Sequence, residues 1–168
     1  MTTPLAGIVK ALIGLTAAGA SGNESEARSV SRQVGNWKND AAVTTTTAIS
    51  ERAVCTARQK CRLVKAKLIL DAAVTGTATD FFTVLVDLRR AALPGTPVNL
   101  ITFAADTPTD DNCVAFGEKD LMVATYAVGA GADFDLLEGD CLTVEVTKAG
   151  SGMTFPVGTL QLELEPRT

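Results

Sequence analysis

The sequence contains no histidine, and only 5% of its residues are aromatic, with a single tryptophan. Histidine is the most frequent general base and the usual partner of a serine or cysteine nucleophile. Few aromatics leave little material for the stacking surface of a sugar-cleaving site. A phosphate-binding glycine loop is also missing, because Gly150-Ser151-Gly152 joins two predicted strands and opens no helix. We therefore expect no enzyme and no cofactor.

Positive charge is scarce as well. The net charge is −4 and the isoelectric point about 4.8, which argues against nucleic acid as a partner, since phosphate binding needs a concentrated positive surface. The apolar segment Leu5–Ala18 is too short to span a bilayer. It carries Lys10 within the run and no positive charge before it, unlike an export signal. We expect synthesis in the cytoplasm, no export signal and no membrane partner.

Metal-binding patterns are weak. The four cysteines match no zinc spacing, and buried free thiols are favoured over two disulfides, because a chain of this length can build a core without them. The acidic residues around Leu136-Leu137 do not follow the calcium-loop spacing. Turn carboxylates are therefore favoured over a calcium site. The cysteines are Cys55, Cys61, Cys113 and Cys141, and the acidic residues are Asp133, Asp135, Glu138 and Asp140.

Over much of the chain, apolar and polar residues alternate in the way that is typical of β-strands. The segment Phe134–Pro166 predicts two strands around a glycine-rich connection, each with one apolar face. Seven or eight short strands separated by turn signals are expected between Glu51 and Glu165, a spacing that indicates a β-sandwich or a small barrel. Of the two, we predict an all-β antiparallel sandwich that is jelly-roll-like. The predicted core contains Leu68, Leu70, Val84, Val86, Leu142, Val144, Val146, Leu160, Leu162 and Leu164.

Two further strands carry the same pattern. Cys61–Ala72 places Val64 and Ala66 inward with Leu68, and Phe81–Leu88 places Phe82 inward with Val84. A Thr-Gly-Thr turn between them suggests a hairpin. Several apolar residues take the opposite parity and need a cover of their own. These are Leu63, Ile69, Leu85, Ile101 and Phe103.

The first part of the chain differs from the rest, so the sequence predicts an arm over residues 1–50 and a sandwich over residues 51–168. A helix is expected over residues 4–16, docking either on its own domain or on a partner protein. Trp37 is the one large apolar residue in the otherwise small and polar segment that follows. The apolar stripe of the helix consists of Leu5, Ile8, Val9, Leu12 and Ile13.

Basic residues are concentrated just after the arm. They belong either to a solvated strand face with its turn, which is favoured, or to a contact patch for an acidic protein surface. The cluster comprises Arg52, Arg58, Lys60, Arg62, Lys65 and Lys67. With the arm, the candidate partner-binding residues are Leu5, Ile8, Val9, Leu12, Ile13, Trp37, Arg52, Arg58, Lys60 and Arg62.

The run Leu137-Glu138-Gly139-Asp140-Cys141-Leu142-Thr143-Val144, followed by a strand, a Gly-x-Gly turn and the alternating strand that ends at Glu165, resembles the closing strands of small β-sandwich head decoration proteins of tailed bacteriophages. Val54–Leu70 and Phe81–Leu88 resemble their opening strands. The resemblance covers roughly Glu51 to Pro166, and its turn-and-strand motifs bear on fold more than on task.

The resemblance implies a cement protein that binds the outside of an assembled capsid, with the major capsid protein as partner and copies of itself in a homotrimer. An arm that orders on binding suits this role, because it wraps a large surface. The alternative is a tail or head fibre domain that binds a host-surface glycan. Such a site would show clustered exposed aromatics, and the sequence does not display them.

Overall fold

The computed structural model describes residues 32–43, 49–107, 111–150 and 153–167. The chain divides into two units, Met1–Val30 and Ser31–Thr168, and every described residue belongs to the second unit. The helix expected over residues 4–16 and its apolar stripe therefore lie outside the described residues.

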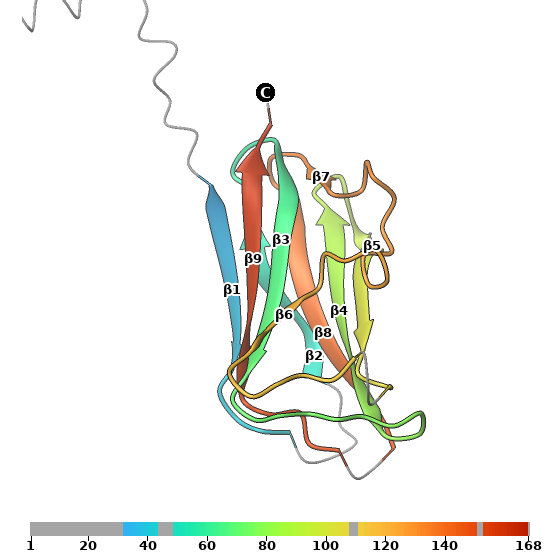
Figure 1. Cartoon of the computed structure of the whole chain (residues 1–168). Coiled ribbons are helices and arrows are strands. Elements are labelled where there is room, and N and C mark those ends of the chain that lie inside the picture. The colour runs from blue at the N-terminus through green and yellow to red at the C-terminus, as the bar shows by residue number, and fades with distance from the viewer. Residues whose placement is uncertain (1–31, 44–48, 108–110, 151–152, 168) are drawn as a thin grey trace, which may run out of the picture. The chain divides into compact units, whose positions relative to one another are not determined.

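The second unit is a sandwich of two antiparallel sheets (Figure 1). One sheet has the order β1-β9-β3-β6, with β7 also paired to β3, and the other has the order β2-β8-β4-β5. No helix occurs among the described residues, so the prediction of an all-β antiparallel sandwich is confirmed. The strands are β1 (Gln33–Asn39), β2 (Ile49–Thr56), β3 (Cys61–Leu70), β4 (Phe81–Arg90), β5 (Leu93–Ala104), β6 (Glu118–Asp120), β7 (Asp135–Leu136), β8 (Cys141–Ala149) and β9 (Gly158–Pro166).

The connections follow a jelly-roll path. Strands β1 to β4 alternate between the two sheets, β4 and β5 are neighbours in one sheet, and β6 and β7 return to the other. Strand β8 then crosses to lie between β2 and β4, and β9 crosses back to lie between β1 and β3. The first and last strands are thus neighbours, as in a double-sheet jelly roll.

The core lies between the facing sheets, where one side of each strand is apolar. All ten residues predicted for it from the sequence are at most 1% exposed. Three aromatic rings pack together in this core, with the ring centroid of Phe82 4.8 Å from that of Phe155 and 6.0 Å from that of Phe103. Edge-to-face pairs of this kind contribute about 0.5–1.5 kcal/mol each beyond the area that they bury.

Strand pairing differs from the prediction at two places. β8 and β9, expected as one strand pair, lie in opposite sheets and face each other across the core. The hairpin expected between Cys61–Ala72 and Phe81–Leu88 is wrong for the same reason, since β3 and β4 also belong to different sheets. An apolar face on each of two strands is satisfied equally well by contact across the sandwich, so the alternation alone does not distinguish the two arrangements.

A β-bulge changes the inward set of β3. The pairing with β9 shifts between Leu63 and Lys65, so the inward parity changes along the strand. Leu63 is consequently buried at 1% exposure, whereas Val64, which was predicted to point inward, is only half-buried.

The opposite-parity apolar residues are largely covered within one chain. Besides Leu63, both Ile101 and Phe103 lie fully inside the core, while Ile69 and Leu85 are half-buried on the outer faces. The register shift between Val86 and Asp87 accounts for the change of parity on β5. The need for cover that pointed to a homotrimer is therefore met mostly by the sandwich itself.

The sandwich also begins earlier than predicted. β1 pairs along its whole length with β9, so the boundary drawn at residue 50 is wrong. Trp37 on β1 is 8% exposed and its ring lies 6.3 Å from that of Phe155, inside the core rather than on an arm. Gly35 lets β1 approach β2 closely, because a Cβ at that position would lie 2.7 Å from the sulfur of Cys55.

Candidate partner-contact surface

A turn between β2 and β3 presents Arg58 and Lys60 to solvent, and its backbone is held from both sheets. The buried Ala57 donates its amide to the carbonyl oxygen of Asp140 at 2.8 Å and accepts from the amide of Gly139 at 2.9 Å. The side chain of Gln33, at the start of β1, bonds the backbone on either side of Ala57, where β2 leads into the turn. Its Nε2 donates to the carbonyl oxygen of Thr56 at 2.6 Å, and its Oε1 accepts from the amide of Arg58 at 3.2 Å.

The buried Asp140 fixes the loop that holds the backbone of this turn. Its carboxylate, on a residue only 2% exposed, accepts from the amides of Ala91 at 2.8 Å and Leu137 at 2.9 Å, and from Nη1 of Arg90 at 2.9 Å. Burial by itself raises the pKa of Asp140, but these donors together lower it below the usual value. The carboxylate thus stays charged and fixes the loop on which Ala57 and its turn rest.

The four basic residues proposed from the sequence divide into three exposed cations and one that is paired. Nη1 of Arg62 lies 3.0 Å from Oδ1 of Asp135, and its guanidinium carbon lies 6.0 Å from the ring centroid of Phe134. Arg52 is exposed on β2, the edge strand of its sheet. Among the described residues, no ion pair involves the side chains of Arg52, Arg58 or Lys60.

The remaining two members of the basic cluster behave as a solvated, paired strand face. Nζ of Lys65 lies 3.6 Å from Oε2 of Glu163, and Lys67 forms an ion pair with Glu118. Exposed pairs of this kind contribute little to stability. On β3 the basic residues therefore belong to a solvated strand face. A contact patch for an acidic protein surface remains a prediction for Arg52 on β2 and for Arg58 and Lys60 on the turn.

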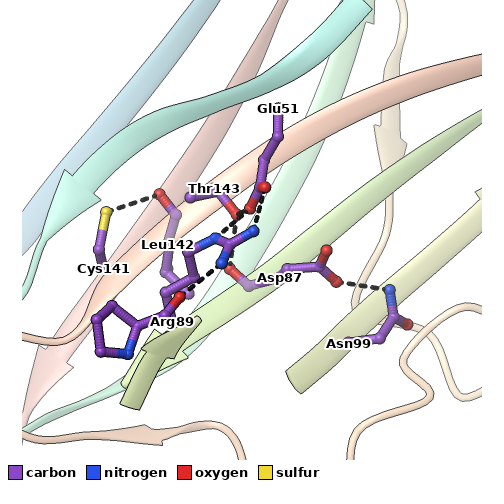
Figure 2. Close-up of polar contacts among 8 residues, drawn as sticks. Glu51, Asp87, Arg89, Asn99, Cys141, Leu142 and Thr143 are labelled. Carbon is purple, nitrogen blue, oxygen red and sulfur yellow. Dashed lines mark hydrogen bonds and ion pairs between the residues drawn. The ribbon is translucent and has the colours of Figure 1, made fainter. Parts of the chain in front are cut away.

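A polar network on the outer face of the four-stranded sheet ties the edge strand β2 to the interior strands (Figure 2). Arg89 on β4 donates to both carboxylate oxygens of Glu51 on β2 and to the carbonyl oxygen of Pro94 at 2.6 Å. The hydroxyl of Thr143 on β8 donates to Oε1 of Glu51 at 2.5 Å. Next to it, Nδ2 of Asn99 donates to Oδ1 of Asp87 at 2.8 Å.

This network is a structural tie, and the sequence did not reveal it. The Arg89 and Thr143 hydrogen bonds lower the pKa of Glu51, despite partial burial, so its carboxylate is a charged acceptor and a poor general base at neutral pH. Alternating polar residues on β2, β4 and β8 were visible in the sequence, but only the register places them side by side. Because Glu51 is held, the neighbouring Arg52 is carried on a fixed strand.

The acidic residues near the β7–β8 turn act as turn and ion-pair groups. Asp135 bonds Arg62 and lies 3.4 Å from Nε of Arg167, and Asp133 accepts from the amide of Ala130 at 2.9 Å. No group of three or more metal-binding side chains is assembled within the described ranges. All four cysteines are free thiols, with Cys61 and Cys113 buried and the other two half-buried.

A cavity of about 540 Å³ lies at the other end of the sandwich, among the connections that join β1 to β2, β3 to β4 and β8 to β9. Its walls combine small apolar residues with a few polar groups, including Asp71, Thr75, Thr77 and Asp80. No aromatic side chain is among its lining residues in the described part of the chain.

Comparison with known proteins finds no matching family model and no similar curated protein. Among solved structures, a chain in the structure of the infectious bursal disease virus Gx strain matches with a TM-score of 0.39 and 12% identity. The match covers 79% of this chain but only 32% of that one, so this chain spans about a third of the viral chain's length. A similarity this weak carries no argument about function. In the part of the chain that is described, no helix has the length and apolarity needed to cross a membrane.

Proposed function

We propose that this protein is a structural component of a virion that binds the outside of an assembled phage capsid and stabilises it, as a decoration or cement protein. The resemblance of its closing strands to those of head decoration proteins supports this. The jelly-roll sandwich supports it as well, since that architecture is common among virion proteins, although fold alone does not determine function.

The observation that carries the proposal is the unequal use of charge on the sandwich. Arg32, Arg62, Arg89 and Arg90 all have carboxylate partners within the domain. Arg52, Arg58 and Lys60 are exposed, and two of them sit on a turn with a fixed backbone. A rigid cationic surface fits an acidic protein surface of the shell or of a neighbouring copy, because complementary charge speeds encounter and fixes orientation.

The N-terminal 31 residues are the second proposed contact. The first strand that follows them, β1, begins beside the cationic turn, since Gln33 bonds the backbone at Thr56 and Arg58. On this proposal the apolar stripe that begins at Leu5 and ends at Ile13 lies in a groove of the major capsid protein. Trp37 takes no part, because its ring is in the core.

The test is binding to capsids that lack this protein. A variant without residues 1–31 keeps all of β1 and should stay folded, unlike one without residues 1–50. We expect it to bind at least about tenfold more weakly, a loss of about 1.4 kcal/mol or more. Leu12→Asp in the full chain should reproduce most of that loss.

The matched control is Val128→Ser, an exposed apolar residue on the sandwich (54% exposed) that should bind as the wild type does. Electron microscopy of decorated particles then locates the protein. If the truncated protein melts normally and decorates capsids with unchanged affinity, the arm is not the contact. If neither protein binds any capsid, the decoration proposal itself fails.

The alternative function, a fibre domain that binds a host-surface glycan, is favoured by one observation, the loop-end cavity of about 540 Å³ with its carboxylate and hydroxyl groups. A volume of this size accepts one or two sugar rings. Specific binding on a glycan array that is lost in Asp71→Ala would favour this alternative over capsid decoration.

A further inference from the structure

The loop between β5 and β6 holds an aromatic side chain in solvent at a conformational cost. Phe116 is 78% exposed, and its φ of 56° lies in the left-handed region that non-glycine residues rarely occupy. Val114, two residues earlier, is 67% exposed. Neither burial nor ease of folding explains two apolar side chains placed in this way.

The backbone of residues 113–117, at the end of this loop, is firmly held. Cys113 and Val74 exchange two hydrogen bonds of 2.9 Å, and the amide of Phe116 donates to the carbonyl oxygen of Leu70 at 2.8 Å. The amide of Gly117 donates to the carbonyl oxygen of Val114 at 3.0 Å. The two apolar side chains therefore project from a rigid backbone, which suits docking because little conformational entropy is lost on binding.

The surroundings of the loop are acidic. The connections at this end, the lower end in Figure 1, contain several aspartates and, within their described residues, no lysine or arginine. Lys38, at the end of β1, lines the same hollow as Asp71 and Phe116, but its charge is paired with that of Asp40 at 2.8 Å. Asp71 follows directly on Leu70, to which Phe116 bonds. The full set is Asp40, Asp71, Asp80, Asp106 and Asp111. We call Val114, Phe116 and Asp71 the acidic-apolar patch.

The opposite end of the same chain carries the complement. Arg58 and Lys60 are exposed cations on the β2–β3 turn, and Leu137, 58% exposed, lies in the loop whose Gly139 bonds Ala57 of that turn. Glu138 of that loop is also exposed, so the two cations outnumber the one carboxylate beside Leu137. We call Arg58, Lys60 and Leu137 the basic-apolar patch. β3 runs from one patch to the other, from Cys61 to Leu70, so the two are roughly 30 Å apart and do not meet within one molecule.

We propose that copies of this chain associate head to tail, with the acidic-apolar patch of one copy against the basic-apolar patch of the next. The two patches carry charges of opposite sign, and each also exposes apolar side chains. The charges can therefore pair across the contact while the apolar side chains are buried in it. Such an interface is heterologous, and it closes into a ring where the rotation between copies allows. The proposal names the neighbouring copy as the partner of the cationic turn, and in that respect it rests on the proposed function.

Two variants separate the patches. Phe116→Asn with Val114→Ser removes both apolar side chains of the acidic-apolar patch, and asparagine at position 116 tolerates the positive φ. Arg58→Glu with Lys60→Glu reverses the basic-apolar patch. All four positions are exposed, so both variants should melt as the wild type does. Val128→Ser is the control, since it removes a comparably exposed apolar side chain outside both patches.

Sedimentation velocity over a range of protein concentrations gives the result, without any capsid. The wild type and Val128→Ser should self-associate, and association should weaken at least about tenfold between about 25 mM and about 500 mM NaCl, because salt screens the charges. Each patch variant alone should be monomeric. A mixture of the two should form a one-to-one heterodimer and nothing larger, since only one intact patch remains on each chain.

A wild type that stays monomeric at every concentration in low salt overturns the proposal. So does a mixture of folded patch variants that stays monomeric, because a head-to-tail contact must be restored in that mixture. Capsid binding by a protein that does not self-associate would leave the decoration role standing while this inference fails.

Discussion

Replacing Trp37 by alanine tests whether the first strand belongs to the folded domain or to a partner-binding arm. Trp37 is 8% exposed on β1 and packs against Phe155. Trp→Ala therefore removes a large side chain from the core and leaves a cavity between the two sheets. Val34→Ala is the matched control, since Val34 lies on the same strand with 58% of its surface exposed.

The expected magnitude follows from the burial. A buried tryptophan removes roughly 150–250 Å² from water, which at about 25 cal/mol per Å² corresponds to about 4–6 kcal/mol as an upper bound. Measured Trp→Ala changes in cores are about 3–5 kcal/mol. Because β1 is an edge strand that can relax, we expect about 3 kcal/mol, which lowers the melting temperature by about 10 °C for a domain of this size.

The assay is urea unfolding followed by far-UV circular dichroism, which does not depend on the chain's only tryptophan. Val34→Ala should change the free energy of unfolding by less than about 0.5 kcal/mol. If Trp37→Ala leaves the unfolding free energy within that range of the wild type and instead weakens binding to capsids, the placement of β1 in the sandwich is wrong and the original arm interpretation stands.

Three further predictions concern groups that are buried or half-buried in the sandwich. Asp140→Asn should lower the free energy of unfolding by about 2 kcal/mol at pH 7, because Arg90 loses its partner but stays partly exposed. The folded-state pKa of Asp140 is lowered, so its contribution to the free energy of unfolding is present above the unfolded-state pKa of about 3.9 and is lost as the pH falls through the folded-state pKa. The difference in unfolding free energy between wild type and Asp140→Asn should therefore shrink in urea titrations at acid pH. A difference that stays constant would contradict the ion-pair account. Burial, with smaller contributions from Cys141 and Cys61, raises the pKa of the Cys55 thiol to about 11 from 9.0. Alkylation of Cys55 near neutral pH should therefore be roughly 100-fold slower than alkylation of a peptide thiol. A rate equal to the peptide's would show that the strands around Cys55 open. Gly35→Ala should destabilise the fold by about 1–3 kcal/mol in thermal melts, because the new Cβ would lie 2.7 Å from the Cys55 sulfur, and an unchanged melt would mean that β1 and β2 are not in close contact.

The inward faces of the longest strands were predictable from sequence. Phe82, Val84 and Val86 share one parity on β4 and are fully buried, while the residues between them are half-buried on the outer face, as period-two alternation requires. The alternation failed where the backbone is irregular. The bulge at Leu63 on β3 adds a residue opposite one on β9, and no residue type at that point announces it.

The surface candidates were predictable only as a group. Six basic residues within a short span were evident, but which of them are free depends on the strands alongside. Arg62 meets Asp135, which is far from it in sequence, while Arg58 lies on a turn whose neighbours are backbone groups. Phe116 attracted no notice in the sequence, because neither its exposure nor its positive φ is visible before the loop is folded.

The sequence by itself determined that this chain builds an antiparallel sandwich and which faces of its strands are apolar, because alternation is a local property of the extended backbone. It also showed that the sequence contains no histidine. Only the tertiary structure decided which strands share a sheet, that Trp37 completes the core, and which basic residues of the described sandwich pair with carboxylates. Those outcomes depend on contacts between residues distant in the chain, and the free energy of such contacts is set by register and burial rather than by the local sequence.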